Sequence, residues 1–151
     1  MELNNFTKKY WTAEDIELLG KVKTVKEMFD IALRVLSRMA RPVVQVCGPI
    51  TSGGKGNVDL NIKYLNDKIS ELQEKGINVF DQMVFEDATM RLKDELSKDK
   101  YFMDLFTYFY LPVFESGFID GLCFLPGWES SRGANWEHEQ AKRLGLRITY
   151  Y

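Results

Sequence analysis

One acidic residue stands behind a small-residue loop, where a carboxylate could do chemistry. The stretch "LPGWESSRGANWEHEQAKRLGL" runs from Leu125 to Leu146, and an apolar run gives way to a small, polar loop before a helix that carries Glu137. Gly133 and Ala134 are small enough to let a ligand approach closely. We expect Glu137 in the first helical turn, where N–H dipoles keep a carboxylate ionised. Such a carboxylate can attack the anomeric carbon of a sugar and form a glycosyl-enzyme ester.

The alternative is a structural role, in which Glu137 is a surface glutamate that complements the helix dipole. This is the commoner role of a glutamate at such a position. Glu129 and Glu139 fit that description better. The two neighbouring tryptophans, Trp128 and Trp136, could stack on a base or a sugar, or could simply pack the loop. The single histidine of the chain, His138, is expected at the surface or at an edge.

A second candidate loop, "GPITSGGKGN", follows the apolar run "VVQVC". Glycines in a strand-to-helix loop let backbone N–H groups approach an anion, and Thr51, Ser52 and Lys55 add polar side chains. The spacing matches neither the dinucleotide-binding fingerprint nor the P-loop. Phosphate binding and a flexible turn with a solvated lysine therefore remain equal alternatives for this segment.

These loops must be positioned by elements whose periodicity can be read from the sequence. Apolar residues at helical spacing, with capping residues at the ends, predict helices over residues 12–22, 24–40, 58–75, 85–116 and 134–144. Short apolar runs predict buried strands over residues 43–50, 77–80, 119–126 and 146–151. Alternating strands and helices imply a parallel sheet covered on both faces, with right-handed crossovers. Ligands bind such sheets at the carboxyl ends of the strands, where both loops lie.

The end signals of these helices are specific. Thr12 is predicted to cap the first helix, and Thr24 with Glu27 gives a capping-box pattern for the second. Pro112 is expected to interrupt the aromatic-rich stretch of residues 85–116. We expect the run of Phe and Tyr between Tyr101 and Phe118 to serve as core or subunit interface rather than as a base-stacking platform.

The bulk composition excludes several classes of function. A chain of 151 residues predicts one compact domain. Its net charge of −2 gives no electrostatic attraction that would favour binding to a nucleic-acid polymer or an anionic membrane. The start of the chain has no apolar signal core, which favours the cytoplasm. Cys47 and Cys123 lie in apolar runs and are expected to be core residues of a reducing compartment. With His138 as the one histidine, neither a zinc site nor a catalytic triad is favoured.

Three segments together resemble the nucleoside 2-deoxyribosyltransferase superfamily: "GPI", "IDGLCFLPGW" and "SRGANWEHEQAKRLGL". The pattern is similar to that of its bacterial and phage members with LPGW…S.GA..E…A..LG, and to the 2′-deoxynucleoside 5′-phosphate N-hydrolases. The resemblance covers about residues 43–151. It implies a Rossmann-like, flavodoxin-type three-layer sheet over residues 42–151, preceded by a helical extension over residues 1–41.

The resemblance implies a role for each matching residue. Glu137 would be the nucleophile, and Ser131, six residues earlier, would contact a 5′-phosphate as in the monophosphate hydrolases. The other residues expected to bind substrate come from the two loops: Gly48, Pro49, Ile50, Gly53, Gly54, Lys55, Trp128 and Gly133. No metal or organic cofactor is implied, and family members are usually homo-oligomers.

Two positions depart from the family pattern. Gln45 stands where members commonly have a tyrosine beside the catalytic carboxylate. Pro112 falls where an aspartate is thought to protonate the leaving base, and Asp104 and Glu115 are the nearest carboxyls. Asp120 matches an aspartate that often opens the third strand and is expected to be structural.

Three functions are compatible with these observations. The first is an enzyme that cleaves the N-glycosidic bond of a nucleoside or its 5′-monophosphate, as hydrolase or deoxyribosyltransferase. The second is a non-catalytic nucleotide-binding or sensing module on the same fold, which the two departures motivate. The third is a phosphoribohydrolase of the cytokinin-activating type, suggested by "GANWE". It ranks last because it needs a longer glycine run than this loop supplies.

Overall fold

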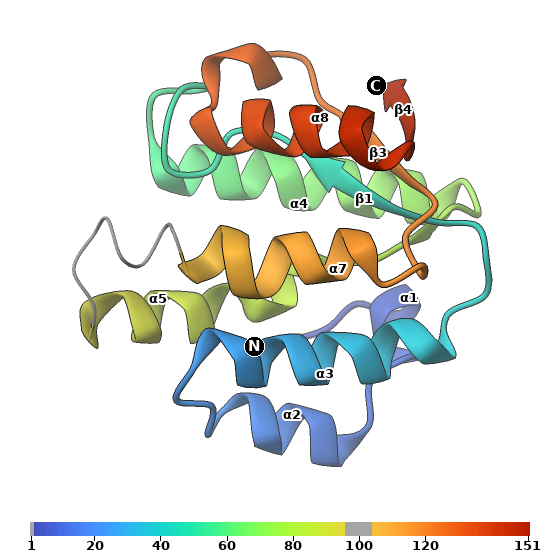
Figure 1. Ribbon diagram of the computed structural model, residues 1–151, viewed down its shortest axis with the longest axis vertical. Coiled ribbons are helices and arrows are strands. Elements are labelled where there is room, and N and C mark those ends of the chain that lie inside the picture. Colours follow the sequence, from blue (N-terminus) through green and yellow to red (C-terminus); the bar gives the residue numbers. More distant parts are fainter. Residues whose placement is uncertain (1, 96–103) are drawn as a thin grey trace. The chain divides into compact units, whose positions relative to one another are not determined.

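The computed structural model describes residues 2–95 and 104–151. Its strands form one parallel four-stranded sheet in the order β2-β1-β3-β4. Their bounds are β1 Val43–Cys47, β2 Asn78–Val79, β3 Gly121–Phe124 and β4 Arg147–Tyr150. Helices flank the sheet (Figure 1), so the α/β Rossmann-like or flavodoxin-like fold predicted from the sequence is confirmed.

The helices agree with the predicted ones in place, with shifted ends. Their bounds are α1 Asn5–Lys8, α2 Ala13–Leu19, α3 Val25–Arg38, α4 Val58–Glu74, α5 Glu86–Glu95, α7 Leu111–Glu115 and α8 Arg132–Leu144. Short turns of other helix types are the 3-10 turns Gln82–Phe85 and Trp128–Ser130 and the π-helical turn Phe106–Tyr110. The single-turn helix α1 is not predicted by the periodicity, because four residues are too few to show a 3.6-residue repeat.

The helix caps follow the local sequence. Thr12 Oγ1 accepts the Asp15 N–H at 3.1 Å, and Asp15 Oδ2 accepts the Thr12 N–H at 3.2 Å, which completes a capping box. Thr24 Oγ1 accepts the Glu27 N–H at 3.2 Å as predicted. The return bond predicted for Glu27 is wrong, because its carboxylate accepts the N–H of Lys23 instead.

The stretch predicted as one helix over residues 85–116 is divided. Helix α5 ends at Glu95, and residues 96–103 lie outside the described residues together with the start of the predicted aromatic run. Pro112 lies in the first turn of α7, directly after the π-helical turn, so the chain changes helix type there instead of breaking. Phe109 and Phe114 are buried, which confirms a core role for these members of the aromatic run.

The described residues divide into two compact units. The residues up to Met39 and those between Gln82 and Phe118 form unit 1, and residues 40–81 with residues 119–151 form unit 2. Unit 2 holds the whole sheet, α4, α8 and both candidate loops. Every residue of the candidate site therefore belongs to one unit.

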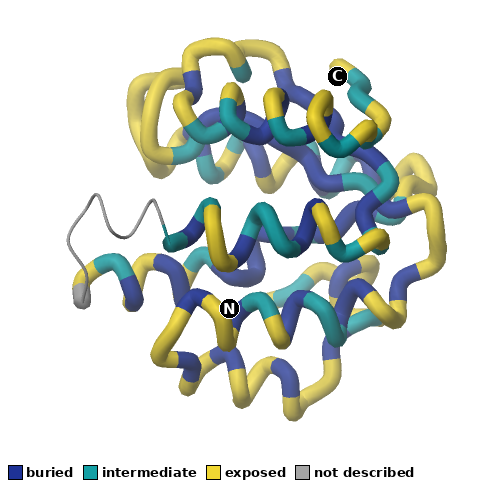
Figure 2. Tube along the Cα trace, in the orientation of Figure 1, coloured by how far each residue is buried: buried dark blue, intermediate teal, exposed yellow. Residues whose placement is uncertain are grey.

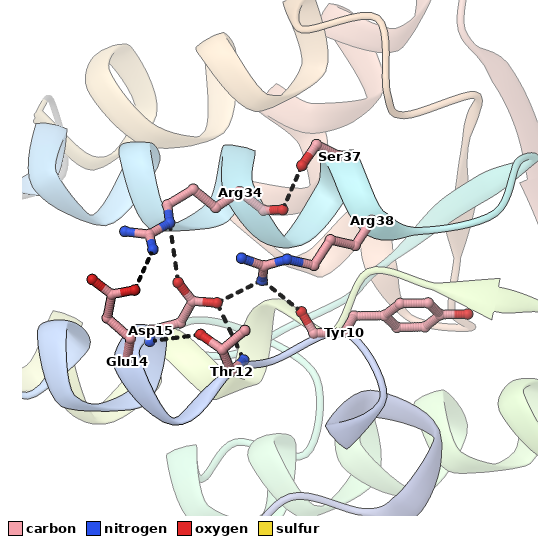
Figure 3. A network of polar contacts seen from close by, with 7 residues as sticks. All are labelled: Tyr10, Thr12, Glu14, Asp15, Arg34, Ser37 and Arg38. Atoms are coloured by element: carbon pink, nitrogen blue, oxygen red, sulfur yellow. Dashed lines mark hydrogen bonds and ion pairs between the residues drawn. The ribbon is translucent and has the colours of Figure 1, made fainter.

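Unit 1 contains a buried carboxylate between α2 and α3. Asp15 is fully buried, and its oxygens lie 3.1 Å from Arg34 Nε and 2.5 Å from Arg38 Nη1 (Figure 3). Burial by itself raises the pKa of Asp15, but the hydrogen bonds from Arg38 and Thr12 outweigh it and leave the pKa below its usual value. Asp15 thus stays ionised and fixes α2 onto α3.

Unit 2 has the layers of a doubly wound sheet. The connections through α4 and α8 extend the sheet in opposite directions from β1 and β3, so right-handed crossovers place these helices on opposite faces. Figure 1 draws α4 as the more distant of the two. Strands β1 and β3 are almost entirely buried (Figure 2). Asp120 joins their starting ends, because it accepts the Val43 N–H at 2.7 Å and pairs with Arg41, as expected of a structural residue.

Candidate active site

The position of Glu137 differs from the predicted one. Helix α8 begins at Arg132, and the N-cap Ser131 accepts the N–H of Ala134 at 3.2 Å. Glu137 is therefore the sixth helical residue, in the second turn instead of the first. The free N–H groups of a helix belong to its first turn, so the dipole argument for an ionised Glu137 does not apply.

Glu137 points from α8 toward the first strand of the sheet. Its carboxyl is buried, with 9% of the residue exposed. Its Oε2 atom accepts a hydrogen bond from Gln45 Nε2 at 3.1 Å and from Cys47 Sγ at 3.3 Å. The two donors are two residues apart in β1 and therefore share one face of the sheet. Glu137 has no cation as a partner among the residues that the structure describes.

This environment favours the neutral carboxyl. The pKa of Glu137 is raised to about 8, because burial raises it by more than the hydrogen bonds from Cys47 and Gln45 lower it. The prediction that Glu137 is ionised at neutral pH is wrong, because burial removes water and no positive group among the described residues replaces it. Burial, and then the nearby Glu137, raises the pKa of the Cys47 thiol well above its usual value. The thiol therefore keeps its proton and acts as a donor.

The two candidate loops contact each other at the carboxyl edge of the sheet. The Gly54 N–H donates to Ser130 Oγ at 2.8 Å, and the Arg132 N–H donates to Ser52 Oγ at 3.2 Å. Gly53 has a φ of +68°, and a Cβ there would lie 2.2 Å from the Ser130 carbonyl oxygen. Only glycine fits this close approach. The juxtaposition agrees with the sequence argument, since β1 and β3 are neighbours in a parallel sheet.

The first loop uses its backbone donors inside the protein. The Lys55 N–H donates to Asn61 Oδ1 at 2.8 Å, and the Gly56 N–H donates to the Gly53 carbonyl at 3.2 Å. With Gly54 bonded to Ser130, three successive N–H groups are committed. The loop is thus an ordered turn whose N–H groups bond within the protein. Phosphate binding by this loop stays a prediction, and it would depend on the side chains. Lys55 is exposed, with its Nζ 4.8 Å from the centre of the Tyr64 ring.

The other predicted loop residues lie at different depths. Gly48 and Pro49 are buried and continue β1 directly from Cys47, so this turn begins next to the Glu137 carboxyl. Ile50 and Gly133 are half-buried.

The single histidine is buried against the edge strand β4, so of its two expected places, at the surface or at an edge, the surface is wrong. The His138 ring stacks on Trp128 with centroids 4.3 Å apart, and its Nε2 lies 2.8 Å from Tyr150 Oη. The edge of Phe124 completes this cluster at 4.9 Å. Burial, and then Lys142, lowers the pKa of His138, so the ring is neutral at pH 7. One face of the half-buried Trp128 ring packs on His138, and stacking of this tryptophan on a base or a sugar stays a prediction.

Cys47 is the partner of Glu137 that sequence reasoning missed, whereas the resemblance had already placed the position of Gln45 beside the catalytic carboxylate. Gln45 is noticeable in the sequence as the one polar side chain in the apolar run "VVQVC". A buried polar residue in a central strand needs a partner, and that signal could have directed attention to it. Nothing in the local sequence identifies Glu137 as that partner, 92 residues further along the chain.

A model of the family described as "Domain of unknown function (DUF4406)" matches residues 42–150. The chain belongs to this family. No curated protein and no solved structure matches the chain. The DUF4406 segment contains all four strands, both loops and α8 with Glu137, whereas helices α1, α2 and α3 precede it.

Other features of the DUF4406 chain bear on the classes of function. Cys47 and Cys123 are buried in β1 and β3, as predicted. Within residues 2–95 and 104–151, no three His, Cys, Asp or Glu side chains gather as a metal site. The helices in the same ranges are all too short or too polar to cross a bilayer.

Proposed function

We propose that this DUF4406 protein cleaves the N-glycosidic bond of a nucleoside or its 5′-monophosphate, with Glu137 as the nucleophile. The observation that carries the proposal is a buried carboxyl, raised in pKa, that two neutral donors hold at the carboxyl edge of a parallel sheet. Such perturbed groups are concentrated at functional sites. The substrate class comes from the resemblance of the segment around Glu137 to the nucleoside 2-deoxyribosyltransferase superfamily.

The proposed reaction proceeds in two displacements. In the first, a carboxylate oxygen of Glu137 forms a bond to C1′ while the bond from C1′ to the base nitrogen breaks. The base leaves with the bonding electrons and takes up a proton from water. In the second, water or an N–H nitrogen of another base attacks C1′, the bond from C1′ to Glu137 breaks with its electrons returning to the carboxylate, and the attacking group gives its proton to solvent. Burial removes water from the ionised carboxylate and thereby makes it a more reactive nucleophile.

A 5′-monophosphate is the preferred substrate in this proposal. Ser131 accepts a hydrogen bond from Ala134 and keeps its own hydroxyl proton, which it can donate to a phosphate oxygen. Ser131 is also neutral, so it does not repel the phosphate as a carboxylate would. Lys55 is exposed on the adjoining loop and supplies a positive charge. The chemistry at the anomeric carbon requires neither metal nor organic cofactor.

The proposed setting is the cytoplasm, with the enzyme as a homo-oligomer. The two buried thiols suit a reducing compartment. Met90 and Tyr108 are large and exposed and are candidates for a subunit interface.

The test uses a panel of nucleosides and their 5′-monophosphates, with the released base measured by chromatography. Wild-type protein is expected to release base, and Glu137→Gln, which keeps the size of the side chain, to release none above background. Glu139→Gln is the matched control, because Glu139 is exposed on the same helix. Base release by Glu137→Gln at the wild-type rate would refute the role of Glu137.

A non-catalytic nucleotide-binding module is the second candidate. A specific observation favours it: a Glu137 with a pKa of about 8 is mostly neutral at pH 7, where it can donate a hydrogen bond but cannot attack carbon. Calorimetry with the same panel discriminates between the two. Binding of a nucleotide without any base released after long incubation, at pH 7 and at pH 9, would favour the module.

A further inference from the structure

Both hydrogen bonds to Glu137 end on the same oxygen. Gln45 Nε2 and Cys47 Sγ each donate to Oε2, and Oε1 receives no hydrogen bond from the described residues. Two donors from one strand fix the rotation of the carboxyl group about its terminal bond. They also make the oxygens unequal, because Oε2 is stabilised and Oε1 is left free to react.

The Gln45 side chain makes no other hydrogen bond to the described residues. It is fully buried, and its Oε1 atom has no hydrogen-bond donor among the described residues. A buried amide oxygen without a donor destabilises the fold, whereas an apolar side chain of similar size would fit the interior of a parallel strand. Among the described residues, the one hydrogen bond of the Gln45 side chain goes to Glu137. A polar residue that costs stability and whose side chain, among the described residues, hydrogen-bonds only to a candidate catalytic group is typical of a functional position.

We propose that Gln45 and Cys47 are positioning residues that hold Oε2 of Glu137 and present Oε1 to the reacting carbon. The inference deepens the proposed function and rests on it for the identity of that carbon. Neither residue touches the reacting atoms in this account, since both act through Glu137.

The two hydrogen bonds from Gln45 and Cys47 to Glu137 Oε2 are called the clamp below. The groups around Glu137 make the effect of this clamp on the pKa measurable. From the sheet, the titratable group that faces Glu137 is the Cys47 thiol, which keeps its proton. On α8, the neighbouring His138 faces Trp128 and Tyr150, and Glu139 is exposed. The two clamp bonds are the influences that favour the ionised carboxyl. Removing either donor must therefore raise the pKa of Glu137 further.

The direct test is a pH titration of the Glu137 side-chain carboxyl by carbon-13 NMR, with the signal assigned by its loss in Glu137→Gln. Gln45→Met and Cys47→Ala should each move the midpoint upward by about one pH unit, as expected for the loss of one hydrogen bond to a charged group. Cys47→Ser keeps a hydrogen-bond donor, so its titration midpoint should stay close to that of the wild type. Cys123→Ser is the matched control, because Cys123 alternates to the opposite face of the sheet and should leave the midpoint unchanged.

Two further readouts separate positioning from a merely structural role. Gln45→Met should unfold at the same or a higher denaturant concentration than wild type, because it removes the unpaired amide oxygen. In base release, Gln45→Met should lower kcat about tenfold or more with little change in KM. An unmoved titration in both Gln45→Met and Cys47→Ala would overturn the clamp. If the wild type releases no base while the titration midpoint moves upward in Gln45→Met and Cys47→Ala, the proposed function is refuted and the clamp is supported.

Discussion

Each of the two units buries a carboxylic side chain, and the surroundings of the two side chains act on them in opposite ways. Asp15 in unit 1 is surrounded by two arginines and a helix cap, and its pKa is lowered. Among the described residues, Glu137 in unit 2 accepts hydrogen bonds only from the amide of Gln45 and the thiol of Cys47, and its pKa is raised to about 8. Burial acts in the same direction on both.

The difference shows that the partner, and not burial alone, decides what a buried acid does. Positive partners keep Asp15 ionised and make it a joint between α2 and α3. Neutral donors orient Glu137 without neutralising its charge, so the ionised form stays high in free energy and reactive. An acid held in that way adds little to stability, which is why we assign chemistry to Glu137 and a structural role to Asp15.

The largest expected effect is on how stability depends on pH. The pKa of Glu137 rises from its usual 4.5 to about 8 on folding. Between these values the folded protein binds more protons than the unfolded chain, so the stabilisation by protonated Glu137 is lost as pH rises. Relative to Glu137→Gln, wild type should lose on the order of 4 kcal/mol of unfolding free energy between pH 5 and pH 9. Urea unfolding at several pH values measures the difference, and parallel curves for the two proteins would contradict it.

The next effect concerns the stability of unit 1. Asp15→Asn keeps the size of the side chain but removes the charge that pairs with Arg34 and Arg38. The free energy of unfolding at pH 7 should fall by about 3 kcal/mol, measured by urea denaturation. Glu14→Gln is the control, because Glu14 pairs with Arg34 at an exposed position and should cost less than about 0.5 kcal/mol. A loss for Asp15→Asn no larger than that of the control would remove the contrast between the two acids.

The smallest effect is on the rate of the proposed reaction. A nucleophile must be ionised, so kcat/KM for base release should rise with pH and level off above about 8, the pKa of Glu137 in the free protein. At pH 6 it should be about a hundredfold below the plateau. Asp15→Asn should leave the midpoint of this profile in place. A profile that is flat from pH 6 to pH 9 would mean that Glu137 does not titrate as the attacking group.

The sequence predicted much of the fold because the deciding interactions are local or periodic. Thr12 and Thr24 cap helices that begin one residue later, and the apolar runs around Val43 and Leu122 are buried strands. The alternation of strands and helices was sufficient to place the two loops at one edge of the sheet. The predicted start of the helix before Glu137, at residue 134, is two residues late, because Ser131 caps this helix.

The order of the elements and the candidacy of Glu137 were determined by the sequence itself, through period, capping and the small residues before the carboxylate. Only the tertiary structure decided the protonation of Glu137, the choice of Gln45 and Cys47 as its donors and the burial of His138 under Trp128. The physical reason is that a pKa depends on how much water is removed and on which groups replace it. Those groups come from a strand about ninety residues away, and their contact with Glu137 exists only once the chain has folded.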